Sequence, residues 1–260
     1  MLAYPQLGTG ALSQFPVRIE RRARTVVNAA PDGTAIKLAD PAGTVTEWTL
    51  NYTGLSDAER FTLEQFFASA QGSLNGFTFV DPAANLLAWS GDPSQPVWVP
   101  DPALTVAGGV GDPFGGTAAW SLTNTGAAPQ SLTQTLPAPG EYLYCLSVYA
   151  RALTAGAVTM SIGTSQTVHT VTEQWARITL AARGDSSEQE VAFGLQVPAG
   201  VQVEIYGMQA EPQPAASEYR VSTTGGVYLN ARLRDDQFTV ITTAPGRHSC
   251  SVRILYVNHL

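Results

Sequence analysis

Residues of the types that most often carry chemistry are present but scattered in this sequence. His169, His248 and His259 lie far apart and lack the close spacing of a metal site such as H-x-x-x-H. Cys145 and Cys250 fit buried free thiols better than a disulfide. No G-x-S-x-G motif, Walker loop or G-x-G-x-x-G motif occurs, and no two carboxylates are marked out as an acid and base pair. We therefore predict no catalytic residues, no metal-ligating residues and a protein that is not an enzyme.

Aromatic residues are the remaining candidates for a binding site, because sugar rings stack on exposed aromatic faces beside polar groups. We predict carbohydrate contacts for four residues: Trp120, Tyr142, Tyr144 and Trp175. Tyr149 and Tyr206 are further aromatic residues of the same region. The competing interpretation is that these side chains fill a core, because a strand of a sandwich buries one face. Tyr142 and Tyr144 share a strand face and Tyr149 lies on the other, so one of these two faces is the core.

Composition and charge narrow the class of protein. Apolar residues make up 44% and charged residues 13% of the chain, with 24 Gly and 17 Pro. This balance is typical of a β-rich protein with many turns rather than of a disordered chain. The net charge of −7 argues against a sequence-specific nucleic-acid surface, which needs basic residues. No apolar run is long enough to span a membrane, so we expect no membrane insertion.

One strong helix signal occurs, at about residues 56–71. Ser56 and Glu59 have the spacing of a capping box at its start, and Gly72 is a natural stop at its end. Apolar residues recur at helical spacing on one face between them: Leu63, Phe66, Phe67 and Ala70. The sequence therefore predicts a helix that packs one aromatic face against a sheet.

Strand patterns surround this helix. Trp48, Leu50 and Tyr52 alternate with polar residues and share one strand face. Pro31-Asp32-Gly33 and Pro41-Ala42-Gly43 are turn signals in the preceding sequence. The segment after residue 217 alternates again but is too short to form a domain alone. We therefore predict that it pairs with the N-terminal region in one discontinuous domain, residues 1–91 and 218–260.

Residues 92–217 form a second region without a helix signal. A stretch rich in Pro, Gly and Asp opens it. Strand candidates then follow at the spacing of a β-sandwich: 117–123, 131–136, 142–152, 156–162, 166–171, 175–182, 189–196 and 201–210. This spacing predicts an inserted antiparallel jelly roll. The predicted fold class is mainly β: a β-sandwich or small barrel with one helix, plus the inserted jelly-roll sandwich.

The second region resembles the carbohydrate-binding-module jelly roll of bacteriophage tail and fibre proteins. The matching pieces are, in order, "AAWSLTNTG", "QSLTQTLPAPGEYLYCLSVYARA", "EQWARITL" and "VEIYGMQAEPQPAASEYRVST". The last is similar to a strand that ends in Gln-x-Glu and leads to Ser-x-Tyr. The resemblance implies that Gln209 and Glu211 tie this strand to neighbouring backbone before Tyr219. It implies no cofactor apart from a structural calcium ion in some such jelly rolls, and no Asp cluster assigns a calcium site here.

The segment "EWTLNYTGLSDAERFTLEQFFASAQGSLNGFTFVDP" resembles phage distal tail and minor tail proteins, including those of gene transfer agents. Its aromatic positions include Trp48, Phe66 and Phe67. The large insertion departs from the simplest members of that class, although several distal tail proteins carry one. The resemblance implies a homo-oligomeric ring, usually a hexamer, at the tip of the tail. Its implied partners are the tail tube protein and the hub or baseplate proteins.

These resemblances lead to a functional prediction. We predict a structural component of the virion tail, made in the host cytoplasm, whose ring joins the tail tube to the hub and fibres. The jelly roll would project outward, and "FPVRIERRARTVV" would supply an intersubunit strand or arm. The alternative is a carbohydrate-binding adhesion module that recognises host surface glycans. A glycan-cleaving enzyme is a third hypothesis, and it would need two carboxylates facing each other across a groove.

Overall fold

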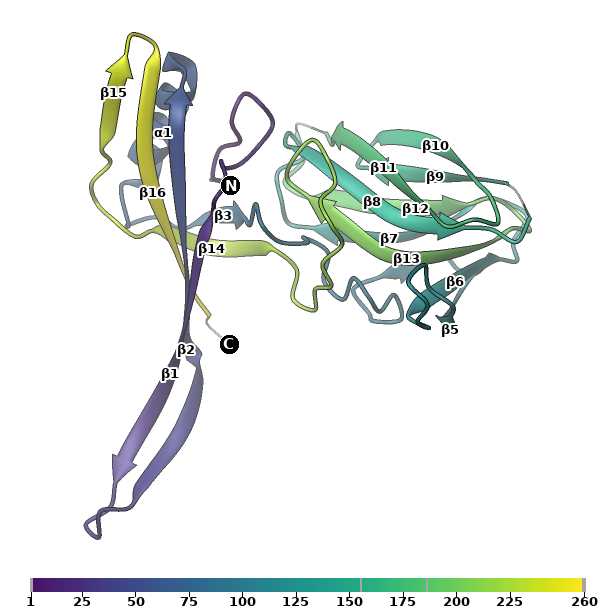
Figure 1. Ribbon diagram of the computed structural model, residues 1–260, viewed down its shortest axis with the longest axis horizontal. Coiled ribbons are helices and arrows are strands. Elements are labelled where there is room, and N and C mark those ends of the chain that lie inside the picture. Colours follow the sequence, from purple (N-terminus) through teal and green to yellow (C-terminus); the bar gives the residue numbers. More distant parts are fainter. Residues whose placement is uncertain (1, 155, 186, 259–260) are drawn as a thin grey trace. The chain divides into compact units, whose positions relative to one another are not determined.

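The fold is described here from a computed structural model, which describes residues 2–154, 156–185 and 187–258. Over these ranges the chain forms sixteen β-strands and one α-helix, arranged in three sheets (Figure 1). The predicted fold class, mainly β with a single helix, is therefore confirmed. The chain divides into two compact units: residues 2–8, 13–79 and 228–258 form unit 1, and residues 9–12 and 80–227 form unit 2.

Unit 1 holds a six-stranded sheet and the helix. Its elements are β1 (Arg18–Ala29), β2 (Ala35–Leu55), α1 (Asp57–Ala70), β3 (Phe77–Val80), β14 (Val227–Leu233), β15 (Val240–Ala244) and β16 (Arg247–Val257). The strand order is β1-β2-β16-β14-β3, with β15 paired to β16. The C-terminal strand β16 pairs antiparallel with β2, from Val45 to Leu55. The two ends of the chain thus contribute neighbouring strands to one sheet.

The helix begins and ends where its sequence signals lie. The Ser56 hydroxyl accepts from the Glu59 N–H at 3.3 Å, and the Glu59 carboxylate accepts from the Ser56 N–H at 3.0 Å. The C-cap is Gln71, in the left-handed conformation with φ of 54°. Phe66 is buried and lies 4.9 Å edge-on from Phe77, whereas Phe67 stacks on Phe238 at 5.6 Å.

Trp48 lies at the centre of the buried face of this sheet. It is fully buried, and its ring lies edge-on at 5.0 Å from Phe79 and 4.7 Å from Tyr228. Such aromatic pairs contribute about 0.5–1.5 kcal/mol each beyond the apolar area that they bury. The alternation around Trp48 in β2 therefore places the core of unit 1 on one face of the sheet.

The prediction of a turn at Pro41-Ala42-Gly43 is wrong, because β2 continues through these residues. The pairing of β1 with β2 shifts there, from Arg22 opposite Val45 to Arg24 opposite Asp40. Residues 41–44 lie opposite Ala23 alone, and this irregularity accommodates Pro41, which has no N–H for a ladder. The two strands consequently run on as a long hairpin beyond the sheet (Figure 1). We call its outer part, residues 23–44, the arm.

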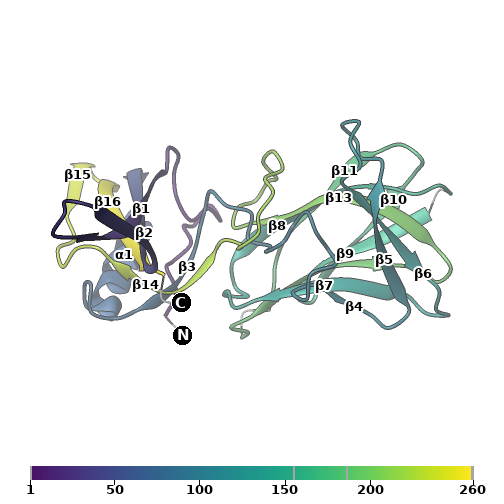
Figure 2. The ribbon, with the colours of Figure 1, turned by 90° about the horizontal axis from the view of Figure 1, so that it is seen from below.

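Unit 2 is a sandwich of two five-stranded antiparallel sheets (Figure 2). Its strands are β4 (Val99–Pro100), β5 (Leu104–Val110), β6 (Ala119–Asn124), β7 (Gln130–Leu136), β8 (Leu143–Arg151), β9 (Gly156–Ile162), β10 (Ser165–Val171), β11 (Ala176–Arg183), β12 (Val191–Val197) and β13 (Gln202–Glu211). One sheet has the order β10-β9-β12-β7-β4 and the other β11-β8-β13-β6-β5. We call the second sheet the aromatic sheet.

The core of the sandwich lies between these two sheets. Alternate residues of each inner strand are buried there, and the largest include Tyr144, Leu146, Met160, Phe193 and Leu195. Tyr144 meets Phe193 across the core, edge-on at 5.4 Å. Fully burying one such apolar side chain stabilises a fold by about 1.5–3 kcal/mol. The other face of each sheet points away from the core, so its side chains contact the covering segments or solvent.

The boundary between the units lies at residues 79/80 and 227/228, outside the expected 91/92 and 217/218. Residues 81–91 and 218–226 hydrogen-bond to each other and to the end of β13. The Asn85 amide donates to the Met208 carbonyl at 3.0 Å and to the Arg220 carbonyl at 3.1 Å. Both flanking segments therefore belong to the sandwich, although their sequences look like linkers.

Candidate functional site

Four aromatic rings gather on the outer face of the aromatic sheet. They belong to Phe114, Tyr149, Tyr206 and Tyr219, and we call them the aromatic cluster. Tyr206 is at the centre, with ring centroids 5.8 Å from Phe114, 6.1 Å from Tyr149 and 5.4 Å from Tyr219. The Phe114 side chain is 71% exposed, and the three tyrosines are partly exposed. The cluster therefore offers aromatic surface to solvent.

The position of the cluster follows from strand alternation. In β8, Val148 and Ala150 face the core, so Tyr149 between them faces outward. In β13, Ile205 is buried and Tyr206 points outward, directly opposite Tyr149 in the ladder. The pairing shifts just after Tyr206, between Tyr206 and Gln209, where Gly207 has a φ of 66°. This bulge turns the next part of β13 and makes room for Tyr219.

Phe114 is held over the sheet by a loop that Asp112 organises. The Asp112 carboxylate accepts from the backbone N–H groups of Phe114 at 2.9 Å, Gly116 at 3.0 Å and Ala118 at 3.2 Å. These hydrogen bonds, led by that from Phe114, hold the pKa of Asp112 below its usual value. The backbone of the loop is thus fixed by local bonds, and the Phe114 ring rests against the rings of Tyr149 and Tyr206.

A cavity of about 180 Å³ adjoins the cluster on the side of Tyr219. Its walls include Ser90, Trp120, Tyr206, Met208, Tyr219 and Val221. The Trp120 indole N–H donates to the Gly91 carbonyl at 3.0 Å, which fixes the ring at the cavity wall. The hydroxyls of Ser90 and Tyr219 lie 3.2 Å apart. An apolar hollow with a few fixed polar groups is the usual form of a small-molecule site.

The hydroxyls of Tyr206 and Tyr219 stay neutral at ordinary pH. Burial raises the pKa of Tyr206, and the nearby Asp112 carboxylate and Tyr149 raise it further. Burial also raises the pKa of Tyr219, partly offset by its hydrogen bond to Ser90. A neutral phenol both donates and accepts a hydrogen bond. The cluster can therefore combine stacking with hydrogen bonding to hydroxyl groups of a ligand.

Two arginines stand beside the cluster. The Arg177 guanidinium lies 5.5 Å from the centroid of the Tyr149 ring, and its Nη2 donates to the Ser147 hydroxyl at 2.8 Å. The Arg151 Nε donates to the Glu204 carboxylate at 2.5 Å, and its guanidinium lies 4.8 Å from the centroid of the Trp175 ring. The charge of Arg151 is thus neutralised by the buried Glu204 carboxylate.

The four residues predicted to contact carbohydrate lie in different environments: two are at the surface and two are in the core. Trp120 lines the cavity, and Trp175 is partly exposed with one face against Arg151. Tyr142 and Tyr144 are 4% and 0% exposed, and the Tyr144 hydroxyl donates to the Pro139 carbonyl at 2.7 Å. The assignment of these two as ligand contacts is therefore corrected: they face the core, where no ligand reaches them.

Sequence reasoning did not select the residues that form the centre of the surface. Tyr149 and Tyr206 were recognisable as aromatic, and the burial of Tyr144 in the same strand implies that Tyr149 faces out. Phe114 comes from a turn-rich loop, and Arg177 from an edge strand. No sequence signal shows that these two lie beside Tyr149, because that proximity comes from the order of strands in the sheet.

Gln209 and Glu211 lie under the segment that returns over the aromatic sheet. Gln209 Nε2 donates to Glu211 Oε2 at 2.8 Å and to the Glu218 carbonyl at 3.1 Å, and its Oε1 accepts from the Arg220 N–H at 2.8 Å. Glu211 accepts from the Ser217 N–H at 2.9 Å and from its hydroxyl at 2.5 Å. The buried pair holds the backbone on either side of Tyr219.

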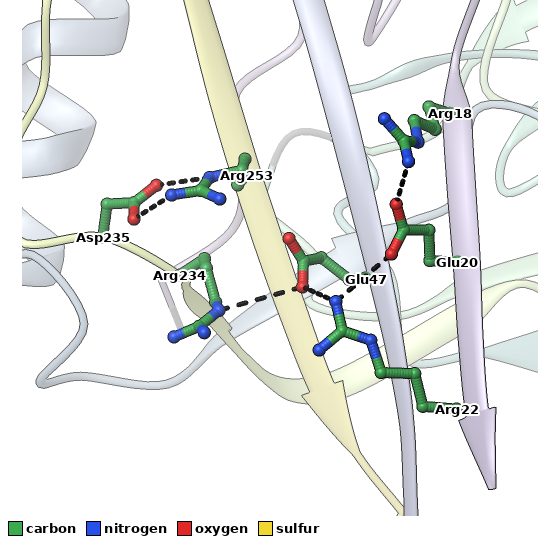
Figure 3. A network of polar contacts seen from close by, with 7 residues as sticks. All are labelled: Arg18, Glu20, Arg22, Glu47, Arg234, Asp235 and Arg253. Carbon is green, nitrogen blue, oxygen red and sulfur yellow. Dashed lines mark hydrogen bonds and ion pairs between the residues drawn. The ribbon is translucent and has the colours of Figure 1, made fainter.

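Unit 1 carries a different polar surface at the base of the arm (Figure 3). Glu47, on β2, is nearly buried and lies 3.4 Å from Arg22 of β1 and 3.8 Å from Arg234, which follows β14. Glu20 continues the network, with Arg18 at 2.5 Å and Arg22 at 3.2 Å. These ion pairs link three parts of the sheet where the hairpin leaves it.

An open groove of about 560 Å³ also lies on unit 1, lined mainly by polar side chains. Arg253 in its wall is held by both oxygens of Asp235, at 2.8 Å and 2.5 Å (Figure 3). Among the residues that the structure describes, its only aromatic lining residue is Tyr52, which is buried. The aromatic surface of unit 2 is therefore the stronger candidate for ligand binding.

Across residues 2–154, 156–185 and 187–258, no group of three or more His, Cys, Asp and Glu side chains is placed to hold a metal ion. Within the same ranges, no helix has the length and apolar character needed to cross a membrane. A structural calcium ion remains a prediction without assigned ligands.

No family model matches this sequence, and no curated protein matches it. Solved structures similar to the chain include the C-terminal family 22 carbohydrate-binding module of Clostridium thermocellum Xyn10B. It is 15% identical, covers 53% of this chain and 99% of its own, and has a TM-score of 0.42. The CBM22-1 xylan-binding domain of Paenibacillus barcinonensis Xyn10C is 12% identical, covers 53% and 97%, and has a TM-score of 0.41.

A third similar structure is the enzymatically active domain of tailspike protein 4 from bacteriophage CBA120. It is 16% identical, covers 51% of this chain and 22% of its own, and has a TM-score of 0.40. At such identities and TM-scores, no conclusion about function follows from the likeness. Nothing in these comparisons identifies a distal tail protein.

Proposed function

We propose that unit 2 is a carbohydrate-binding module whose ligand lies on the aromatic cluster and enters the adjoining cavity. The observation that carries this proposal is the exposed set of four rings centred on Tyr206, next to a cavity walled by Trp120 and Tyr219. Sugar rings have apolar C–H faces and hydroxyl edges. A surface of aromatic faces with neutral phenol hydroxyls matches both.

The rigidity of the surface favours this role. Tyr149 and Tyr206 are on neighbouring strands of one sheet, Asp112 fixes the loop of Phe114, and the Gln209–Glu211 pair holds the backbone around Tyr219. Aromatic side chains lose little conformational entropy on binding, and a fixed backbone loses less still. Binding a flexible glycan therefore requires mainly the ligand to become ordered. No chemical step is needed for this role.

The test is binding of the full chain to a glycan array, followed by calorimetric titration with the best ligands. Replacing Tyr206 with Ala should weaken binding by about tenfold or more, equivalent to about 1.4 kcal/mol. Phe61→Ala is the matched control, because Phe61 is an exposed aromatic residue on α1, outside the cluster. Absence of binding to every glycan at high protein concentration would refute the proposal. Release of new reducing ends would indicate a glycan-cleaving enzyme instead.

A second function is favoured by the arm of unit 1. We propose that the chain is also a structural component of a phage tail tip, assembled as a ring through this hairpin. Val26, Ile36 and Leu38 share one face of the arm, and Ile36 and Leu38 are 54% and 52% exposed. An isolated two-stranded hairpin is only marginally stable in water. A neighbouring copy in a ring would cover this face and stabilise the arm.

Light scattering on the purified chain tests this second proposal. A closed ring, for which a hexamer is our expectation, would support it, and a strict monomer at micromolar concentration would count against it. A monomer that assembles when tail tube protein is added would support a ring that forms only on the tube. The hub or baseplate proteins are the other proposed partners, and co-sedimentation with them is the corresponding assay.

A further inference from the structure

We propose that the glycan bound at the aromatic cluster is acidic, and that Arg177 binds its carboxylate. This inference rests on the proposed carbohydrate-binding function, because it names the class of sugar that the same surface takes. Arg177 of β11 pairs with Tyr149 of β8, and Tyr149 pairs with Tyr206 of β13.

These three side chains form a row across the outer face of the sheet. Neighbouring strands lie about 4.8 Å apart, so the row spans roughly 10 Å. Phe114 extends it at the far end, where its ring lies 5.8 Å from Tyr206. A row of this length suits two linked sugar rings lying across the strands. The guanidinium then stands at one end of the ligand and the phenyl ring at the other.

Arg177 is held in position but keeps unused hydrogen-bond donors. Nη2 donates to Ser147, and the guanidinium plane rests near the Tyr149 ring. Nε is buried and has no partner in the described part of the chain. No carboxylate among the described residues lies within 4.0 Å of Arg177, and its Nη1 makes no hydrogen bond to them. A fixed guanidinium whose Nη1 donors have no partner in the described part of the chain is suited to binding a carboxylate.

The acidic groups near the row do not compete for Arg177. Glu204 already binds Arg151, at 2.5 Å. The Asp112 carboxylate accepts from three backbone N–H groups of its own loop. Asp112 also lies on the Phe114 side, close enough to Tyr206 to raise its pKa. The row is therefore positive at β11 and negative at the loop, which orients an acidic sugar with its carboxylate toward β11.

The experiment compares carboxylated glycans with their carboxyl-reduced forms, which carry a neutral hydroxymethyl group in place of each carboxylate and are otherwise the same. Oligomers of galacturonate, alginate, hyaluronate and polysialic acid are titrated into the full chain, each beside its reduced counterpart. We expect at least one acidic form to bind about tenfold or more tightly than its reduced form. Arg177→Gln should remove that preference, and higher ionic strength should weaken it. Arg183→Gln, an exposed arginine on the same strand, is the control that should keep it.

The outcomes separate this inference from the proposed function. If the wild-type chain prefers the carboxylated glycan, and the preference is lost in Arg177→Gln but kept in Arg183→Gln, then the acidic ligand and the carbohydrate-binding function are both supported. Equal binding of acidic and reduced forms, lost in Tyr206→Ala, refutes the acidic ligand but leaves carbohydrate binding intact. A preference that survives Arg177→Gln also refutes the role of Arg177. Absence of binding to every acidic and neutral glycan refutes both. Circular dichroism of each variant excludes misfolding as the cause.

Discussion

The ring of Tyr219 lies directly against the backbone of Gly207, where an added Cβ would come within 2.9 Å of the tyrosine Cγ. Gly207 sits at the bulge that follows Tyr206 in β13, with a φ of 66°. This contact places Tyr219 beside Tyr206 and forms one wall of the cavity. The shape of the candidate site therefore depends on a residue without a side chain.

Replacing Gly207 with Ala should destabilise unit 2 and weaken glycan binding together. The positive φ alone costs about 1–2 kcal/mol for a residue with a Cβ, and the contact with Tyr219 adds to it. Gly200→Ala is the matched control, because Gly200 has a φ of 71° but no atom near its added Cβ. Chemical denaturation and ligand titration of both variants check the prediction. Equal losses in the two would show that the ring contact contributes nothing.

Glu211→Gln should loosen the segment that carries Tyr219. The carboxylate accepts from the Ser217 N–H and hydroxyl, and an amide NH₂ group placed there would face a donor. The expected loss is about 1–3 kcal/mol in unfolding free energy. Glu218→Gln should change little, because the Glu218 side chain is exposed. Hydrogen exchange at the amides of 217–220 would reveal the loosening, and unchanged protection there would contradict it.

Glu47→Ala should destabilise the base of the arm more than Glu20→Ala does. Glu47 is nearly buried between Arg22 and Arg234, so its loss leaves Arg234 without its carboxylate and Arg22 with Glu20 alone. We expect a cost of about 1–3 kcal/mol, reduced from that of a deep ion pair because both arginines are partly exposed. Glu20 is more exposed, so water screens its ion pairs and their loss should destabilise the fold less. Thermal denaturation of the two variants gives the comparison.

Placing a charge on the apolar face of the arm should prevent assembly without unfolding unit 1. The two variants to compare are Leu38→Asp and Lys37→Asp. Leu38 lies on the face shared with Val26 and Ile36, whereas Lys37 lies on the opposite face. If a neighbouring copy covers the apolar face, the first variant should be monomeric and the second should still assemble. Sedimentation velocity distinguishes the two. Normal assembly of Leu38→Asp would exclude this face as the interface.

Both cysteines should be unreactive in the folded protein near neutral pH. Burial raises the pKa of Cys145 to about 11, with the Glu211 carboxylate adding to the shift, and burial raises the pKa of Cys250 to about 11. In the unfolded chain these thiols ionise near pH 9. The stability that comes from burying them in the neutral form is therefore fully present below pH 9. It is lost as the pH rises toward 11. Titration with a thiol reagent at pH 8 should label both only after denaturation.

Much of the fold could be predicted from local patterns. Ser56, Glu59 and Gly72 mark the ends of the helix, and the strands of unit 2 appear close to their predicted positions. Capping and alternation act between residues that are near in sequence, so the sequence shows them directly. A proline signal does not distinguish a turn from an irregular pairing within a long hairpin, and so the turn predicted at Pro41 is wrong.

The sequence by itself determined which strands exist, that Tyr144 and Tyr149 face opposite ways, and that Gln209 and Glu211 share a face of β13. Only the tertiary structure decided which face is the core, and so which tyrosines reach solvent. It also decided that Arg177, Tyr149 and Tyr206 form one row, since strands far apart in the chain become neighbours. Strand order depends on long-range packing, which no local pattern records.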